Sequence, residues 1–349
     1  MSRLLLSDFD YDLPSEFIAQ SPLEPRDASR LLVLERRTGR IEHSQFHEIG
    51  NYLRAGDILV LNETRVLPAR LYARKLPGWG KAELLLLRRI DPTTYEVLVG
   101  GKGLKVGRRL QIYTLEGETG ELEAEIISEL EGSRRIVQFN QPLDAWLERA
   151  GHVPLPPYIH THLKDPERYQ TVYARQPGSA AAPTAGLHFT SGLIATLTAL
   201  GVRFAKITLH VGLDTFAPVK ENHPEQHRIH TEWCQVTPQA AEAINQAHQS
   251  GCRVVAVGTT SVRTLESAVD PAHSTSLIHP YEGATDLFIL PGYKFRVVDG
   301  MVTNFHLPRS TLLMLVSAFA GRECILHAYS IAKAEGYRFY SFGDAMLII

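Results

Sequence analysis

The chain has 349 residues, about two domains at the usual size of roughly 150 residues each. Hydrophobic residues make up 44% of it and charged residues 21%, a globular balance that excludes a long disordered or fibrous protein. Lys and Arg total 36 against 38 for Asp and Glu, so the net charge is -2. That charge excludes a uniformly basic nucleic-acid-binding protein but leaves room for a local basic patch.

The cysteines and the N-terminal residues bear on the cellular compartment. Cys234, Cys252 and Cys324 form no C-x-x-C pair, and their odd number argues against a disulfide framework. No apolar run approaches the roughly 20 residues of a membrane-spanning helix. The first residues carry acids where a signal peptide has its apolar core. We therefore expect a cytoplasmic protein without a membrane partner.

The first half of the chain predicts one buried strand and then a run of short strands. The buried strand is the apolar segment 58–61. Short segments of alternating polarity then recur at 70–74, 95–99, 122–126 and 135–139. Closely spaced short strands, separated by Pro and Gly turns, are typical of a small β-barrel. A helix over 143–150 and a Pro-rich segment over 153–158 follow.

The second half predicts helices and strands in alternation. Thr190 or Ser191 caps a helix that ends before Gly201, and Thr237 caps the next, with Pro238 at its first position. Further helices are expected over 262–268, 310–320 and 322–335. Strands are expected over 202–209 and 253–257, and a hairpin with a type I′ turn at 299–300 joins 295–298 to 301–305.

This order of elements predicts the fold class as α/β. We expect a mixed-sheet α/β main domain, formed by residues 1–64 and 151–349. An inserted small β-barrel domain of residues 65–150 interrupts it.

Three loops are candidate ligand sites. Residues 182–190 precede a helix, where free backbone N–H groups bind anions. This loop also holds Gly186, which permits close approach, and His188, which exchanges protons near neutral pH. Residues 209–216 follow a strand end, where open α/β sheets place ligands. Residues 258–263 open a helix with a Gly and three hydroxyls, which suits ribose, carboxylate or phosphate oxygens. Ordinary capping loops and strand-exit turns are the alternative in each case.

A group of histidines lies between residues 223 and 230, with glutamates among them. His223, His227 and His230 suggest a metal site, but Pro224 interrupts the backbone and no H-E-x-x-H pattern is present, so we expect no metal. If this piece is a strand, His230 and Glu232 share one face. They then form a proton-transfer or hydrogen-bonding pair.

Basic residues concentrate in the predicted barrel domain. They are Arg65, Arg70, Arg74, Lys102, Lys105, Arg108 and Arg109. Such side chains can bind phosphates without reading sequence. Solvated barrel hairpins are the alternative.

Nine segments, in order along the chain, resemble one family. They lie at 26–31, 61–70, 151–158, 183–190, 210–212, 227–232, 258–263, 303–308 and 342–346. Through them the chain resembles the S-adenosylmethionine:tRNA ribosyltransferase-isomerases of queuosine biosynthesis. Three positions depart from that family: Asp214 stands where Gly is usual, Glu63 where Asp is usual and Ile229 where Met is usual. Asp tolerates a left-handed backbone, so the turn at 214 need not refold.

The resemblance implies a reaction. The ribosyl part of S-adenosylmethionine is transferred to 7-aminomethyl-7-deazaguanine at the tRNA wobble position and rearranged, giving epoxyqueuosine with release of adenine and methionine. The sulfonium compound is then a consumed substrate, no cofactor or metal is required, and the partner is the tRNA anticodon arm. We expect a monomer. A tRNA methyltransferase that uses S-adenosylmethionine and a non-catalytic tRNA-binding protein are the alternatives.

The chemistry assigns candidate roles. The sulfonium acidifies the C5′ hydrogens, so a modest base suffices, and adenine leaves best when protonated, so an acid is also needed. His188 or His210 is the expected base, and Glu232 with His230 handles a second proton. The expected substrate-binding residues are Gly186, Leu187, Phe189, Gly212, Gly258, Thr259, Thr260 and Arg263. The expected RNA-binding residues are Arg26, Arg30, Asn62, Arg65, Arg70, Lys102 and Lys105.

Overall fold

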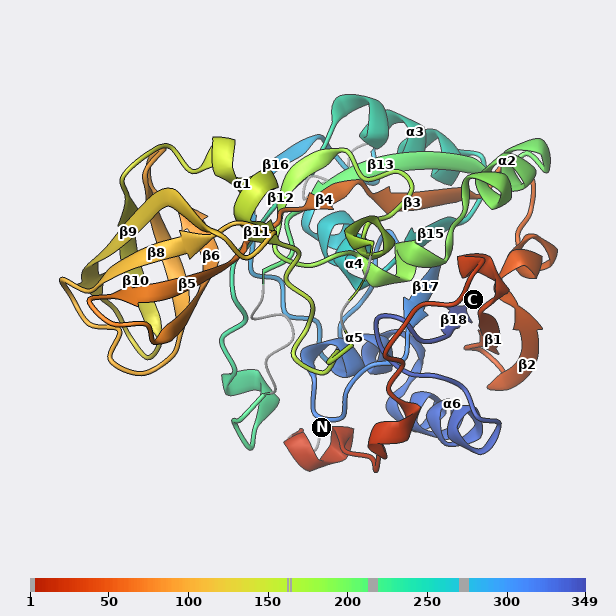
Figure 1. Ribbon diagram of the computed structural model, residues 1–349. Helices are drawn as coiled ribbons and strands as arrows, with labels where there is room; N and C mark the ends of the chain where they lie inside the picture. The colour runs from red at the N-terminus through yellow and green to blue at the C-terminus, as the bar shows by residue number, and fades with distance from the viewer. Residues whose placement is uncertain (1–3, 162, 164, 213–218, 270–275) are drawn as a thin grey trace. The chain divides into compact units, whose positions relative to one another are not determined.

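The computed structural model describes residues 4–161, 163, 165–212, 219–269 and 276–349 (Figure 1). The chain divides into two compact units. The larger unit consists of residues 1–65, 157–176 and 182–349, and the smaller of residues 66–156 and 177–181. Each unit has its own hydrophobic core.

A mixed sheet of nine strands forms the centre of the larger unit. In spatial order the strands are β16 (Tyr281–Thr285), β14 (Glu232–Val236), β13 (Arg203–Leu209), β3 (Ile58–Asn62), β15 (Val254–Val257), β17 (Gly300–Asn304), β18 (Ala345–Ile348), β1 (Arg30–Glu35) and β2 (Arg40–Gln45). The run β13-β3-β15-β17 is parallel, as is β18-β1, and the other neighbours are antiparallel. The β3 and β15 strands are apolar along almost their whole length because both faces of the sheet are covered.

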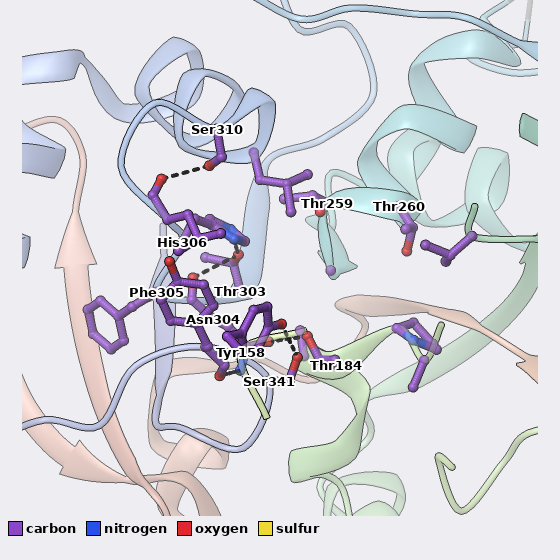
Figure 2. A pocket seen from close by; sticks show the side chains of 18 residues that line it. Tyr158, Thr184, Thr259, Thr260, Thr303, Asn304, Phe305, His306, Ser310 and Ser341 are labelled. Atoms are coloured by element: carbon purple, nitrogen blue, oxygen red, sulfur yellow. Dashed lines mark hydrogen bonds between the residues drawn. The ribbon is translucent and has the colours of Figure 1, made fainter. Parts of the chain in front are cut away.

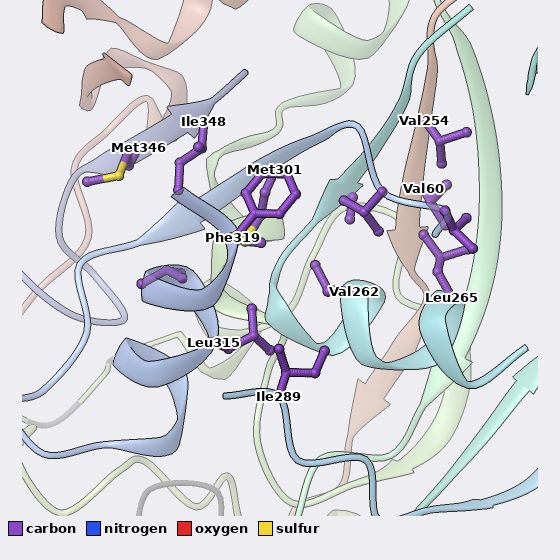
Figure 3. Packing of buried hydrophobic residues seen from close by; sticks show 14 of the residues in the cluster. Val60, Val254, Val262, Leu265, Ile289, Met301, Leu315, Phe319, Met346 and Ile348 are labelled. Atoms are coloured by element: carbon purple, nitrogen blue, oxygen red, sulfur yellow. The ribbon is translucent and has the colours of Figure 1, made fainter. Parts of the chain in front are cut away.

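Two hydrophobic clusters cover the two faces. Alternate residues of one strand enter different clusters: Val254 and Ala256 face one side of the sheet, Val255 and Val257 the other. The first cluster packs against α3 (Pro238–Gln249), α4 (Thr259–Ser267), α5 (Thr311–Ala320) and α6 (Arg322–Ala334), as Figure 3 shows in part. The second packs against α2 (Ser191–Ala199) and the 3-10 segments η4 (Phe46–Tyr52) and η6 (Thr184–His188).

The helix caps follow the predicted pattern. Thr190 accepts a hydrogen bond from the Leu193 N–H at 3.1 Å, and Thr237 accepts one from Ala240 at 3.2 Å. The α4 helix begins three residues earlier than expected, because Thr259 and Thr260 are already helical. Shorter elements are η1 (Leu6–Phe9), η2 (Ser15–Phe17), η3 (Arg26–Ala28), β4 (Thr64–Val66), η5 (Pro166–Tyr169), β12 (Gln176–Ser179) and η8 (Pro224–Gln226). No single described helix is long and apolar enough to cross a membrane; α5 and α6 reach that length and composition only as a pair bent by 111°.

The smaller unit is a closed antiparallel barrel of six strands. Their order is β5 (Arg70–Leu76), β6 (Lys81–Arg89), β7 (Thr94–Gly100), β10 (Arg134–Phe139), β9 (Thr119–Glu129) and β8 (Arg109–Tyr113). Pairing of β5 with β8 closes the barrel, and β11 (Gly151–His152) adds to β5. The helix α1 (Asp144–Ala150) packs Trp146 against the barrel core. The predicted α/β domain with a small β-barrel is confirmed.

The predicted hairpin at 295–305 is wrong. Residues 295–299 form no strand, and β17 pairs instead with β15 on one side and β18 on the other. The backbone N–H groups of Val297 and Val298 donate to the Glu266 carboxylate at 3.0 and 3.2 Å. The Glu266 side chain on α4 therefore accepts the hydrogen bonds that a neighbouring strand would accept in a hairpin.

Candidate active site

One pocket of about 670 Å³ opens at the edge of the large sheet where parallel strands end (Figure 2). Its lining comes from residues 158, 182–185, 211, 258–260, 303–307, 310, 312, 340 and 341. The β15 and β17 strands both end here, and α4 and α5 both begin here. This edge is where open α/β sheets place ligands. We call it the strand-end pocket.

The first turn of α4 forms one wall of the strand-end pocket. Gly258 has φ of 90°, a backbone conformation that favours glycine, and no side chain caps the helix at this residue. The first backbone N–H groups of a helix have no partner within the helix, and they carry partial positive charge. With the hydroxyls of Thr259 and Thr260 beside them, they form a wall suited to carboxylate or ribose oxygens.

Asn62 supports this wall from behind. Its side-chain N–H donates to Leu209 O at 3.0 Å and to Thr260 Oγ1 at 3.3 Å, and its carbonyl accepts from the N–H groups of Thr64 and Leu209. Asn62 is fully buried. We expected this residue at the RNA surface, and it instead joins the ends of two strands to α4.

A second wall is formed by the five residues that end β17 and follow it. Figure 2 shows His306 beside Thr303 and Asn304 beside Thr184. The Nε2 of His306 is 2.7 Å from Thr303 Oγ1, and the Thr184 hydroxyl donates to Asn304 Oδ1 at 3.0 Å. Burial lowers the pKa of His306 to about 3, so its ring is neutral at neutral pH. Sequence reasoning did not single out His306 or Asn304 as site residues, although both lie in one of the nine family-like segments.

The strand-end pocket is uncharged. Among the described residues that line it there is no Asp, Glu, Lys or Arg. Hydroxyls, one amide and one imidazole provide its polarity, and Tyr158 and Tyr340 provide aromatic surface, whereas Phe305 is fully buried. Uncharged polar groups can hydrogen-bond to a ligand directly, because no ion pair within the protein has to be broken first.

His188 lies behind the strand-end pocket and does not line it. The ring is fully buried and stacks on Phe46 at 4.9 Å between ring centroids. Its Nε2 accepts from Asn304 Nδ2 at 3.2 Å and from Arg26 Nη2 at 3.3 Å, which leaves Nδ1 to donate to Ser29 Oγ at 2.6 Å. Burial, with Arg26 nearby, lowers the pKa of His188 well below its usual value. This neutral ring holds the amide of Asn304, which does line the pocket.

The other residues expected near His188 are part of the core. A Cβ on Gly186 would lie 2.1 Å from the Tyr173 hydroxyl, so glycine is required here by close packing within the protein. Leu187 is buried, and Phe189 packs edge to face with Phe46. None of the three lines the strand-end pocket, whereas their neighbours Thr184 and Ala185 do.

A second pocket, of about 440 Å³, contains the expected Glu232, Arg263 and His230. Glu232 and Arg263 form an ion pair, and each side chain is only 4% exposed. Glu232 also accepts from the Gly212 N–H at 2.8 Å, and Arg263 Nε donates to Leu287 O at 3.0 Å. We call this the ion-pair pocket; Leu312 lines both pockets.

The geometry proposed for His230 and Glu232 is wrong in one respect. The β14 strand begins at Glu232, so His230 precedes the strand and does not share a strand face with it.

His210 also lies apart from the strand-end lining: its Nδ1 is 2.8 Å from Thr64 Oγ1 and its ring stacks on Trp233. Burial lowers the pKa of His210. Asp214 lies outside the described residues.

The arginines expected to bind RNA in the larger unit have protein partners. The guanidinium of Arg26 reaches His188 and the carbonyl of Gly343, and burial lowers its pKa to about 9. Arg30 lies 3.8 Å over the Tyr337 ring, and Arg65 pairs with Glu167. Arg26 is therefore directed into the protein, while Arg30 and Arg65 remain partly exposed.

In the smaller unit the expected basic residues lie on the barrel surface. Lys102 and Lys105 are exposed, and Arg70 pairs with Glu83 at 3.0 Å. Trp79 is 77% exposed, with the Arg74 guanidinium 4.0 Å over its ring.

No group of three or more His, Cys, Asp or Glu side chains within the described ranges is arranged to hold a metal ion.

Comparison with known proteins shows the family. The sequence profile described as "Queuosine biosynthesis protein" matches residues 6–348. The chain belongs to this family. It is 55% identical to the S-adenosylmethionine:tRNA ribosyltransferase-isomerase of Caldanaerobacter subterraneus subsp. tengcongensis, over 98% of this chain and 99% of the relative. It is 54% identical to the protein of the same name from Symbiobacterium thermophilum, over 99% of each.

A solved structure agrees with these relatives. The S-adenosylmethionine tRNA ribosyltransferase of Thermotoga maritima is 42% identical, with a TM-score of 0.56 over 98% of this chain and 100% of that chain. The family member described here is therefore an enzyme of queuosine biosynthesis, a transferase and isomerase that modifies tRNA.

Proposed function

We propose that this enzyme transfers the ribosyl group of S-adenosylmethionine to 7-aminomethyl-7-deazaguanine at the tRNA wobble position and rearranges it to the epoxycyclopentanediol of epoxyqueuosine. Adenine and methionine leave, and the sulfonium compound is a consumed substrate, so no cofactor takes part. The observation that carries the proposal is the strand-end pocket, an uncharged space at the ends of parallel strands that is lined by hydroxyls, one amide and one imidazole.

The strand-end pocket suits the separate parts of this substrate. The α4 N-terminus, with Gly258, Thr259 and Thr260, offers N–H groups and hydroxyls for the methionine carboxylate or the ribose. Tyr158, which is partly exposed, offers aromatic surface for adenine. The absence of Lys and Arg from the described lining means that no fixed positive charge repels the sulfonium.

The residues behind the lining hold it in place. Asn62 fixes Thr260, and His188 fixes Asn304 through a hydrogen bond of 3.2 Å. We assign His188 to this positioning role. Glu232, Arg263 and His230 stay candidates for the second proton transfer, because the ion-pair pocket shares Leu312 with the strand-end pocket.

The barrel supplies candidate contacts for the RNA. Lys102 and Lys105 are exposed cations that suit phosphates. Trp79, backed by Arg74, presents an exposed ring of the kind on which unpaired bases stack. Anticodon loops offer both unpaired bases and closely spaced phosphates.

The direct test uses an anticodon stem-loop carrying 7-aminomethyl-7-deazaguanine, incubated with the enzyme and S-adenosylmethionine. Mass spectrometry is expected to show the RNA gaining one rearranged ribosyl unit, with adenine and methionine formed in equal amounts. Formation of S-adenosylhomocysteine would instead show methyl transfer. An unchanged sulfonium compound beside a competent acceptor would overturn the proposal.

A further inference from the structure

The segment after β17 holds one imidazole rigidly against the strand-end pocket. The backbone N–H of His306 donates to the Tyr329 hydroxyl at 2.9 Å, and its carbonyl accepts from the Tyr11 hydroxyl. Contacts from α6 and from the N-terminal segment thus fix the backbone on both sides of this residue. Contacts within the protein therefore hold the backbone of His306, and the ring itself contacts the Thr303 hydroxyl.

The contacts of Thr303 provide a basis for assigning the tautomer of His306. The Thr303 hydroxyl has a second acceptor, Asn304 O at 3.3 Å, so we assign it as the donor to that carbonyl and as the acceptor from His306 Nε2 at 2.7 Å. The proton then lies on Nε2, and Nδ1 keeps the lone pair. Nδ1 makes no hydrogen bond to any residue that the structure describes.

No other group in the described lining is suited to take up a proton. The lining contains no carboxylate, amine or thiol, and its only histidine is His306. Burial raises the pKa of the Tyr158 and Tyr340 hydroxyls, so both stay protonated. Asn304 and the Thr and Ser hydroxyls are not bases near neutral pH.

We propose that His306 is the general base that removes a C5′ proton from S-adenosylmethionine, with Thr303 as its positioning residue. This inference rests on the proposed function and names the base within the same site. His306 thereby replaces His188 and His210 as the expected base, since neither of those lines the pocket.

The proton transfer leaves the charge of the pocket unchanged. The C5′–H bond breaks, its electron pair stays on carbon beside the sulfonium as a neutral ylide, and the proton passes to Nδ1. Burial opposes adding a charge to the empty pocket, but here the cation only moves from substrate to imidazole. The imidazolium can then give that proton to the departing adenine, which returns His306 to its neutral form. The proton lost by the acceptor amine passes to solvent.

The decisive variant is H306Q, because a glutamine side chain can keep a donor near Nε2 while it lacks the Nδ1 base. We expect turnover to fall by about 10²- to 10⁴-fold, the usual effect of removing a general base. The dissociation constant for S-adenosylmethionine, measured by calorimetry, is expected to change by less than about threefold. Turnover within about threefold of wild type, or a loss of binding as large as the loss of turnover, would overturn the inference.

Thr303 gives a second test that leaves the imidazole in place. T303V removes the acceptor for Nε2, so we expect a roughly tenfold lower kcat with little change in KM, and T303S is expected to restore it. With S-adenosylmethionine deuterated at C5′, T303V is expected to show a larger isotope effect on kcat, because proton removal becomes more nearly rate-limiting. An unchanged kcat and isotope effect in T303V would contradict the positioning role.

Assays of the wild-type enzyme and H306Q together distinguish a failure of the proposed function from a failure of the role assigned to His306. If it forms no epoxyqueuosine and no adenine, the proposed function fails. If wild type and H306Q both form them at similar rates, the function stands and only the role of His306 fails. Thermal unfolding of each variant checks that the fold is retained.

Discussion

The strand-end pocket and the ion-pair pocket are lined by the same helix but are built in opposite ways. The first turn of α4 presents Thr259 and Thr260 to an uncharged space, whereas Arg263, one turn later, is neutralised by Glu232. Each of these two buried charges is already satisfied by its partner, and removing one partner alone leaves the other charge uncompensated. Open hydroxyls and helix N–H groups still have bonding capacity, and that capacity supports the proposal that the substrate binds in the strand-end pocket.

The largest effect is expected from breaking the ion pair. E232A leaves the Arg263 charge buried and unpaired, and we expect a loss of about 3–5 kcal/mol in unfolding free energy, measured by urea denaturation. The double variant E232L/R263M removes both charges and is expected to regain most of that loss. Equal destabilisation by the single and double variants would show that the pair is not organised as described.

The buried, neutral histidines predict that the free energy of unfolding depends on pH. His188 and His306 both have lowered pKa values, because burial disfavours their charged forms. Below an unfolded pKa of about 6.5 the unfolded chain takes up protons that the folded chain does not, so stability falls as pH falls. Each histidine contributes about 1.4 kcal/mol per pH unit between pH 6.5 and 5.

Urea denaturation at a series of pH values measures this dependence. H306Q is expected to lower the slope of stability against pH by one proton, since it removes one of the groups responsible. An unchanged slope in H306Q would mean that His306 is protonated in the folded enzyme.

The α4 wall gives a smaller effect on binding. T259V/T260V removes two hydroxyls from the strand-end pocket, and hydrogen bonds contribute about 1 kcal/mol each. We therefore expect affinity for S-adenosylmethionine to fall by roughly 10- to 30-fold with RNA affinity unchanged. The control is T198V, on the exposed side of α2, which is expected to leave both affinities intact. Equal loss in the control would remove the α4 wall from the substrate site.

Much of the fold could be predicted from local patterns. The caps at Thr190 and Thr237 and the apolar strand at 58–61 depend on neighbouring residues, and the structure contains all three. The hairpin failed because Glu266, far along the chain, binds the backbone at 297–298. Such long-range partners leave no periodicity in the sequence.

In the candidate site, too, local sequence signals could be recognised and long-range contacts could not. Gly258, Thr259 and Thr260 were found because a glycine and hydroxyls at a helix start are a local signal. His188 was chosen for its residue type and loop, but burial and the bonds to Arg26 and Asn304 are properties of the folded chain. His306 had an equally local signal, directly after a strand, and what distinguishes it is the uncharged space around it.

The charged residues on the barrel surface give a further comparison, because they are exposed to solvent and line neither of the two pockets. Lys102 and Lys105 are exposed, so their removal is expected to cost little stability. If they bind phosphates, K102A/K105A should weaken anticodon stem-loop binding and lower the slope of log affinity against log salt by about 0.7–0.9 for each phosphate that is no longer neutralised. Binding of S-adenosylmethionine should not change.

The matched control on the same barrel is R88A/R134A, which removes two arginines that both pair with Glu96. If both double variants lower the slope equally, the barrel attracts RNA by its overall charge; a decrease confined to K102A/K105A places the RNA interface at these two lysines.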